Sequence, residues 1–119
     1  MKQILIALVA ILHFYFLVLE MFLWTKPKGL KVFRMTPEKA AVTQVLAANQ
    51  GLYNGFLAAG LVWALVHPDP SVGTDLATFF LVCVIVAALY GGYSVGRKIL
   101  YIQGGPALLA LLANALLTT

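Results

Sequence analysis

The apolar stretch from Ile4 to Trp24 reads "ILIALVAILHFYFLVLEMFLW" and decides the class of protein. A helix of such residues rises ~1.5 Å per residue and is long enough to cross the ~30 Å hydrocarbon core of a membrane. Similar runs cover Ala40–Val66, Leu76–Val95 and Ile99–Leu117. With 62% hydrophobic and 10% charged residues, the chain lies outside the composition of soluble domains. The sequence therefore predicts an integral membrane protein.

Start and stop signals divide these runs into four predicted helices within a single domain, residues 1–119. Pro27 ends the first helix, Pro37 suits the first position of the second, and Asp75 suits the cap of the third. The fourth helix follows a Gly-Gly-Pro break that ends at Pro106. We expect an all-α membrane protein, a four-transmembrane-helix bundle, with helices at about 3–24, 37–66, 75–98 and 105–118.

The positive charges lie on one side of this predicted bundle. Seven of the eight Lys and Arg residues lie in the first and third connections between helices. In a four-span protein these two connections face the same side, and the positive-inside rule places them in the cytoplasm. We therefore expect residues 25–38 and 97–104 to be cytoplasmic and both termini to lie outside. Topology and anionic lipid account for the net charge of +4, so nucleic acid is not a predicted partner.

The stretch "LAANQGLYNGFLAAG", Leu46 to Gly60, places four polar side chains inside the second predicted span. At ~100° per residue they fall within one arc of about 140°, beside a stripe of small residues. Such groups should face another helix, a partner subunit or a water-filled cavity, because facing lipid is unfavourable. Hydrogen bonding between helices and a ligand site both stay open. The four residues are Asn49, Gln50, Tyr53 and Asn54.

Further polar groups lie in the other predicted spans. Glu20 must be uncharged or paired with a cation, for which Arg97 is a candidate. Tyr90, Tyr93, Arg97 and Tyr101 are 3, 4 and 4 residues apart and would share a face of a continuous helix. No metal site is predicted, because no Cys and His residues have metal-ligand spacing. The candidate ligand-binding residues are Glu20, Asn49, Gln50, Tyr53, Asn54, Tyr93, Arg97, Tyr101 and Gln103.

The segments "EMFLW", "ANQGLYNGFLAAG" and "YIQGGPAL" together resemble an uncharacterised bacterial membrane family, domain-of-unknown-function family 1304. That resemblance covers nearly the whole chain, implies a multi-pass protein of the bacterial inner membrane and brings no assigned activity. More distantly, "AANQGLYNGFLA" and "GRKILYIQG" resemble the MAPEG superfamily of eicosanoid- and glutathione-metabolising membrane proteins. This second resemblance implies a homotrimer with a glutathione or lipid site between subunits on the cytoplasmic side.

Few individual residues carry the MAPEG resemblance. Asn49 and Tyr53 match an Asn and a Tyr of its helix-two motif, and Tyr101 matches the first Tyr of its helix-four motif. The motif's Glu is Leu52 here, and its Arg is Val45. The predicted fourth helix contains no Lys or Arg to hold a glutathione thiolate. Without a cation nearby, a thiol of pKa ~8.5 is mostly protonated at neutral pH and a poor nucleophile.

Three functions follow from these observations. We favour a homo-oligomeric membrane protein without catalysis, with a polar site at a helix or subunit interface for a small amphipathic ligand. The second is a glutathione- or lipid-dependent MAPEG-like enzyme, in which Tyr101 and Arg97 are the catalytic candidates and glutathione the cofactor. The third is a small oligomeric transporter built on His13 and Glu20. Membrane lipid is an expected partner in all three.

Overall fold

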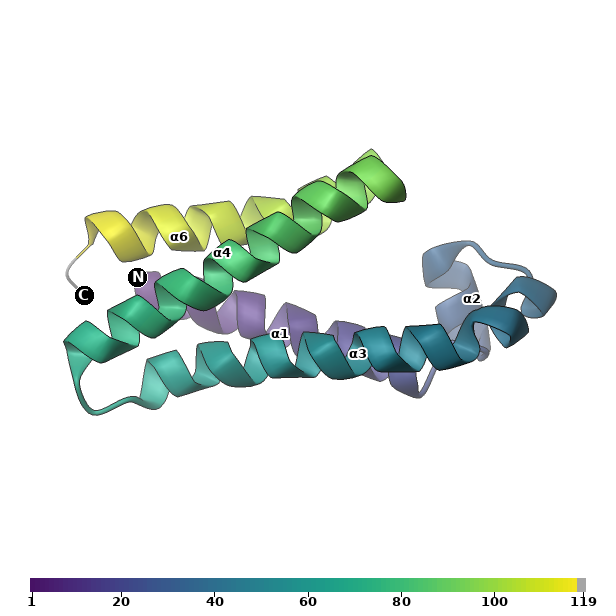
Figure 1. The fold of residues 1–119 in the computed structure, drawn as a ribbon, viewed down its shortest axis with the longest axis horizontal. Coiled ribbons are helices and arrows are strands. Elements are labelled where there is room, and N and C mark those ends of the chain that lie inside the picture. The colour runs from purple at the N-terminus through teal and green to yellow at the C-terminus, as the bar shows by residue number, and fades with distance from the viewer. Residues whose placement is uncertain (118–119) are drawn as a thin grey trace. The chain divides into compact units, whose positions relative to one another are not determined.

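A computed structural model describes residues 1–117, in which helices are joined by short turns and no strand occurs (Figure 1). The all-helical class that the sequence predicts is confirmed. Residue 118, the last of the predicted fourth helix, lies outside the described residues. The elements are α1 (Lys2–Met21), α2 (Pro27–Phe33), α3 (Pro37–Val66), α4 (Pro70–Ser94), α5 (Arg97–Ile99), the π-helix η1 (Leu100–Gly104) and α6 (Gly105–Leu116).

Three helical segments are long and apolar enough to cross a membrane: Lys2–Met21, Pro70–Ser94 and the continuous Arg97–Leu116. They agree with the membrane class predicted from the sequence. Helix α3 is longer, with 30 residues and thus a length of about 45 Å. It is not among the three, because polar residues near its middle lower its hydropathy. A membrane crossing by α3 therefore stays a prediction.

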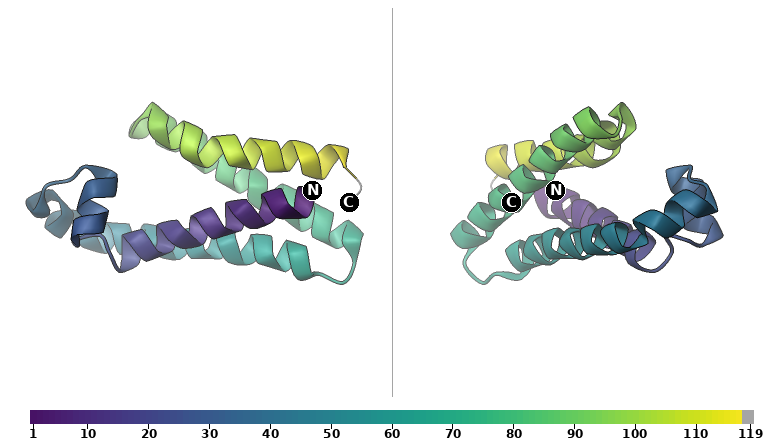
Figure 2. Two further views of the ribbon diagram at one scale, coloured as in Figure 1. Left: turned by 180° about the vertical axis from the view of Figure 1, so that it is seen from behind. Right: turned by 45° about the vertical axis from the view of Figure 1, so that its right-hand side comes forward.

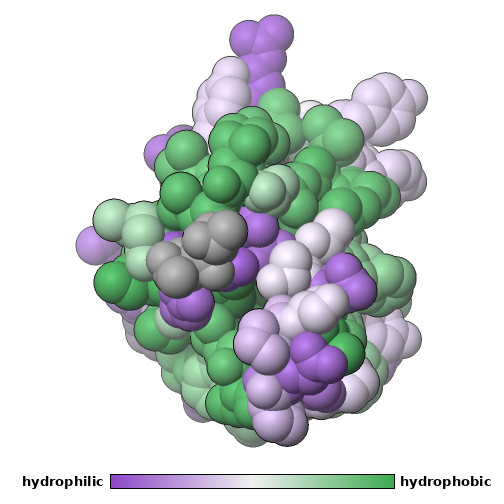
Figure 3. Space-filling model, turned by 90° about the vertical axis from the view of Figure 1, so that its left-hand side faces the viewer, coloured by the Kyte–Doolittle hydropathy of each residue, from purple (hydrophilic) through white to green (hydrophobic). Residues whose placement is uncertain are grey.

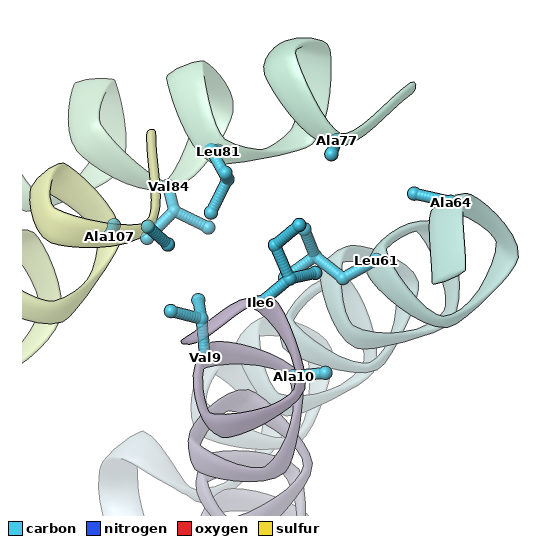
Figure 4. Close-up of a cluster of buried hydrophobic side chains, with 10 residues drawn as sticks. Ile6, Val9, Ala10, Leu61, Ala64, Ala77, Leu81, Val84 and Ala107 are labelled. Atoms are coloured by element: carbon cyan, nitrogen blue, oxygen red, sulfur yellow. The ribbon is translucent and has the colours of Figure 1, made fainter. Parts of the chain in front are cut away.

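The chain divides into two compact units. Unit 1 comprises residues 1–11 together with the chain from Leu57 onward, and unit 2 comprises residues 12–56. In unit 1, α1, α3, α4 and α6 contribute side chains to one buried cluster (Figure 4). Many of these side chains are alanines, which let helix backbones approach closely. The cluster consists of Ile6, Val9, Ala10, Leu61, Ala64, Ala77, Leu81, Val84, Ala107 and Ala110.

The helix predicted at 75–98 begins earlier in the structure. The Asp69 carboxylate accepts a hydrogen bond of 2.9 Å from the backbone N–H of Ser71. Pro70 fits the first helical turn, where its missing N–H leaves no donor unpaired. Helix α4 therefore begins at Pro70, and Asp75 lies inside the helix instead of at its cap.

The same helix also ends before the predicted residue 98. Gly96 has φ 167° and ψ 160°, and the chain turns there so that α4 and α6 lie side by side (Figures 1 and 2). Tyr90 and Tyr93 belong to α4, whereas Arg97 and Tyr101 belong to α5 and η1. The predicted continuous face of these four residues is wrong, because helical periodicity does not persist across Gly96.

The predicted break at Gly104, Gly105 and Pro106 does not interrupt the last helix. The π-helix η1 joins α5 to α6, so the chain is helical from Arg97 to Leu116. Pro106 follows η1 directly and has no N–H to donate to a carbonyl of that preceding turn. In a regular α-helix the ring of Pro106 would clash with the carbonyl of Ile102, four residues earlier. The wider turn of η1, which contains Ile102, lies at this position. Helix α6 itself begins at Gly105, the predicted residue, and continues the helical path that starts at Arg97.

The first predicted helix ends at Met21, and α2 occupies part of the predicted connection after it. Pro27 lies in the first turn of α2, and Arg34 follows its last residue with φ 51°, a left-handed conformation common at helix ends. Gly29 is buried so close to the Leu23 carbonyl oxygen that a Cβ atom would overlap it. Local turn chemistry thus builds a helix where the sequence predicts a loop.

Candidate functional site

Glu20 is the centre of the polar groups in unit 2. Its side chain is 2% exposed, near the C-terminal end of α1. One carboxylate oxygen accepts a hydrogen bond of 2.5 Å from the Asn54 amide. The other oxygen accepts a hydrogen bond from the Gln50 amide. Gln50 and Asn54 are one turn apart on α3, so both amides reach the same carboxylate. We call Glu20, Gln50 and Asn54 the Glu20 cluster.

Two glycines of α3 let α1 approach the Glu20 cluster closely. A Cβ atom at Gly51 would lie 2.7 Å from Met21 Cγ and 3.0 Å from Glu20 Cβ. A Cβ atom at Gly55 would lie 2.5 Å from Leu17 Cδ1. The predicted stripe of small residues therefore packs against α1, and the amides bond across it. Hydrogen bonding between helices accounts for the Glu20 cluster.

The other two residues of the predicted polar arc lie at the surface. Asn49 is exposed, and Tyr53 is 60% exposed with its ring 6.0 Å from that of Phe56. Within the single chain no helix covers these two side chains, and the expectation that a partner subunit covers them stays a prediction. Gln50 and Asn54 donate to Glu20 of α1, whereas neither Asn49 nor Tyr53 forms a hydrogen bond with the Glu20 carboxylate in the described part of the chain.

His13 lies two turns before Glu20 on the same helix and is fully buried. Its ring meets the edge of the Phe16 ring, with 5.3 Å between the centroids. At ~1.5 Å per residue, His13 and Glu20 are about 10 Å apart along α1. That separation is too long for a direct hydrogen bond, as the sequence predicts.

The remaining candidate residues belong to unit 1, near the turn between α4 and the last helix. Tyr93, Arg97 and Tyr101 are exposed, and Gln103 is half-buried. The predicted pairing of Glu20 with Arg97 joins residues of different units and stays a prediction. Among the described residues, no group of His, Cys, Asp and Glu could hold a metal ion.

Tyr101 lines a cavity of about 390 Å³ between α4 and the last helix. This volume falls within the range of ~300–1,000 Å³ that is usual for small-molecule sites. Of the described residues that line the cavity, Tyr101 alone has a polar side chain. The cavity can therefore hold an apolar chain whose polar end lies at Tyr101. The other lining residues are Ile85, Ala88, Leu89, Leu100, Gly104, Gly105 and Leu108.

The π-helix forms part of the wall of this cavity. It contributes Leu100, Tyr101 and Gly104, and α6 contributes Gly105 next to them. Single π-turns inside helices are frequent at functional sites. At Gly105 a Cβ atom would meet nothing within 4 Å, so the missing side chain keeps space open.

A second polar cluster, also in unit 1, was not among the residues that the sequence singled out. Asn114 is 3% exposed and donates to the Thr74 carbonyl at 3.1 Å and to the Thr78 hydroxyl at 3.0 Å. Lys2, 9% exposed, donates to the Thr74 hydroxyl at 3.4 Å. The sequence feature that could have indicated this cluster is Asn114, the single polar residue in the apolar run from 107 to 117.

Comparison with known proteins gives a family and no activity. The family model described as "Protein of unknown function (DUF1304)" matches residues 7–115. The chain is 36% identical over 113 residues to the uncharacterized protein YpaA of Lactococcus lactis subsp. lactis (strain IL1403). The matched region covers 93% of this chain and 93% of YpaA. No solved structure matches. The predicted resemblance to the uncharacterised family is confirmed, and the distant likeness to the MAPEG superfamily stays a prediction.

Proposed function

The chain belongs to the DUF1304 family of proteins of unknown function, and we propose that it binds a small amphipathic anion in the membrane. The observation that carries this proposal is the apolar cavity of about 390 Å³ with Tyr101 at its polar end. An alkyl chain of the ligand fills the cavity, and its head group lies beside the Tyr101 hydroxyl. Cavities of this kind, largely apolar with one or two placed polar groups, are typical of small-molecule sites.

The charges near Tyr101 favour an anionic head group. Arg97 and Lys98 are exposed at the start of the last helix, and Arg97 lies about one turn before Tyr101. The chain contains no Asp or Glu after Asp75. A carboxylate such as that of a fatty acid is attracted to this region, whereas an ammonium is repelled.

The proposal includes α3 as a fourth membrane crossing, with both termini on the non-cytoplasmic side of the bacterial inner membrane. Gln50 and Asn54 lower the mean hydropathy of α3, but their amides bond to Glu20. Helix α3 therefore presents fewer unpaired polar groups to lipid than its hydropathy indicates. Asn49 and Tyr53 remain exposed on the single chain. Assembly into a homo-oligomer, with a trimer favoured, covers these two side chains.

Thermal melting of the purified full chain in detergent tests the proposed ligand class. We expect dodecanoate to raise the melting temperature, and dodecylamine, glutathione and a short-chain quinone to leave it unchanged. Gly105→Leu places a side chain in the cavity and should abolish the shift. Gly96→Leu is the matched control, because a Cβ atom there also meets nothing within 4 Å and Gly96 does not line the cavity.

The control variant separates cavity binding from partition of the fatty acid into the micelle, which affects both variants equally. A dodecanoate shift that survives Gly105→Leu would contradict the proposal. For the head group, Arg97→Gln and Tyr101→Phe should each weaken dodecanoate binding several-fold. Unchanged dodecanoate affinity in both variants would contradict the placement of the head group beside Tyr101 and Arg97. It would not contradict binding of the alkyl chain in the cavity, which Gly105→Leu tests.

A further inference from the structure

The first turns of α1 and α4 border a second cavity in unit 1, of about 240 Å³. It is distinct from the cavity beside Tyr101, with which it shares no lining residue. Several of its lining side chains carry hydrogen-bond donors, and none of the described lining residues is acidic. The donors are on Lys2, Gln3, His67, Thr74 and Asn114.

Lys2 is the charged group of this cavity. Its side chain is 9% exposed, yet its ammonium has a single hydrogen bond within the described part of the chain, at 3.4 Å to the Thr74 hydroxyl. An ammonium has three N–H donors, and burying a charge is unfavourable unless it is paired or fully hydrogen-bonded. The Lys2 ammonium therefore has further N–H donors, for which the described part of the chain supplies no acceptor.

The backbone adds positive potential to that of Lys2. Helices α1 and α4 both begin at this cavity, and the N-terminal end of a helix carries partial positive charge. Asp69, which accepts a hydrogen bond from the Ser71 N–H, and Asp75, which is exposed, are the acidic residues next to lining residues in sequence, and neither lines the cavity. A buried cation next to two helix N-termini is electrostatically unfavourable alone and favourable with an anion.

The depth of the cavity identifies the anion. Lys2 and Pro70 are the first residues of two candidate membrane spans, so the cavity lies at the level of the lipid head groups. Figure 3 views the end of the molecule at which α3 is joined to α4, where hydrophilic residues gather between hydrophobic ones. The anions concentrated at that level are lipid phosphates. The cavity volume of about 240 Å³ is well above the ~10–15 Å³ that a single water molecule requires, so the cavity has room for a polyatomic anion.

We propose that this cavity binds the phosphate group of an anionic membrane lipid, with Lys2 as its charged partner and the Thr74 hydroxyl and the Gln3 amide as additional hydrogen-bonding groups. Charge-assisted hydrogen bonds between an ammonium and phosphate oxygens are the strong contacts of such a site. Binding there orders the ends of α1 and α4 against each other.

Titration calorimetry on the full chain in detergent tests this site. The probes are a short-chain phosphatidylglycerol, a short-chain phosphatidylcholine and inorganic phosphate. We expect phosphatidylglycerol to bind tightest, and Lys2→Gln to weaken it at least tenfold. Lys2→Arg should retain binding because it retains the cation. Lys28→Gln is the matched control, since it removes the same charge from an exposed lysine of α2.

The possible results separate the alternatives. Equal phosphatidylglycerol affinity in Lys2→Gln and the wild type would overturn the site, and so would equal weakening by Lys2→Gln and Lys28→Gln, which indicates attraction by net charge. Lys2-dependent binding of inorganic phosphate as tight as that of the lipid would overturn the lipid as ligand and support free phosphate. Melting temperatures of the Lys2 variants without lipid, close to that of the wild type, verify that each variant is folded.

Discussion

Glu20 and Lys2 are both buried ionisable residues of α1, and their surroundings differ. Each oxygen of the Glu20 carboxylate accepts a hydrogen bond from an amide of α3. The Lys2 ammonium has one long hydrogen bond to a hydroxyl and adjoins a cavity. A buried carboxyl group that its own fold surrounds with hydrogen-bond donors serves to hold helices together. A buried charge with spare donors and space beside it is available for a ligand.

Loss of the Glu20 carboxylate should produce the largest effect on stability. Glu20→Ala removes the acceptor of two amides, including that of buried Asn54, and leaves a void. We expect the free energy of unfolding to fall by about 2–4 kcal/mol, measured by denaturant titration in micelles. Glu38→Ala, at an exposed carboxylate in the first turn of α3, is the control. Equal losses in the two variants would show that the Glu20 cluster does not hold the helices.

Asn114 should matter less than Glu20. Asn114→Ala removes two hydrogen bonds, but the Thr74 carbonyl still accepts a bond of 2.9 Å from the Thr78 hydroxyl. We expect a loss of about 1–2 kcal/mol by the same titration. A loss as large as that of Glu20→Ala would mean that Asn114 holds α6 to α4 as strongly as the Glu20 cluster holds α1 to α3.

Lys2 itself should contribute little to stability when no lipid is present. Lys2→Met keeps an unbranched apolar side chain and removes a buried cation that has a single hydrogen bond. Replacing an incompletely paired buried charge by an apolar group is often neutral, so we expect a change below about 1 kcal/mol in lipid-free detergent. A loss of several kcal/mol there would remove the contrast with Glu20.

Asn49 should produce the smallest effect in the single chain. Its side chain is exposed, so Asn49→Ala should change the free energy of unfolding by about 0.5 kcal/mol or less. Size-exclusion chromatography with light scattering, run on the same samples, reports the assembly state. A larger loss of stability together with dissociation would show that a partner subunit covers Asn49.

The class of protein could be predicted from sequence because length and hydropathy of a helix are local properties. The bounds of α3 follow from Pro37 at its start and the prolines after His67 at its end. Which polar residues of α3 meet Glu20 could not be predicted. That choice depends on the rotation of α3 about its own axis, which the packing of Gly51 and Gly55 against α1 determines.

The polar cluster of Lys2, Thr74 and Asn114 and the cavity beside Tyr101 could be predicted less well from the sequence. Lys2, Thr74 and Asn114 come from three helices and form no pattern along the chain, so only the packing of those helices brings them together. The sequence did single out Tyr101, but it placed a helix break at Gly104 and Gly105. The π-helix that shapes the cavity arises from backbone hydrogen bonding around Pro106, which residue spacing does not reveal.

The π-helix also has a consequence for how the gene can change. A π-turn holds one residue more than an α-turn, so deletion of one codon within residues 100–104 would restore regular α-helical bonding. The chain before the deletion would then rotate by about 100° relative to α6, which carries Arg97 and Tyr101 away from the cavity. Such a chain would lose the polar end of the cavity, so the proposed ligand binding depends on the one additional residue of the π-helix.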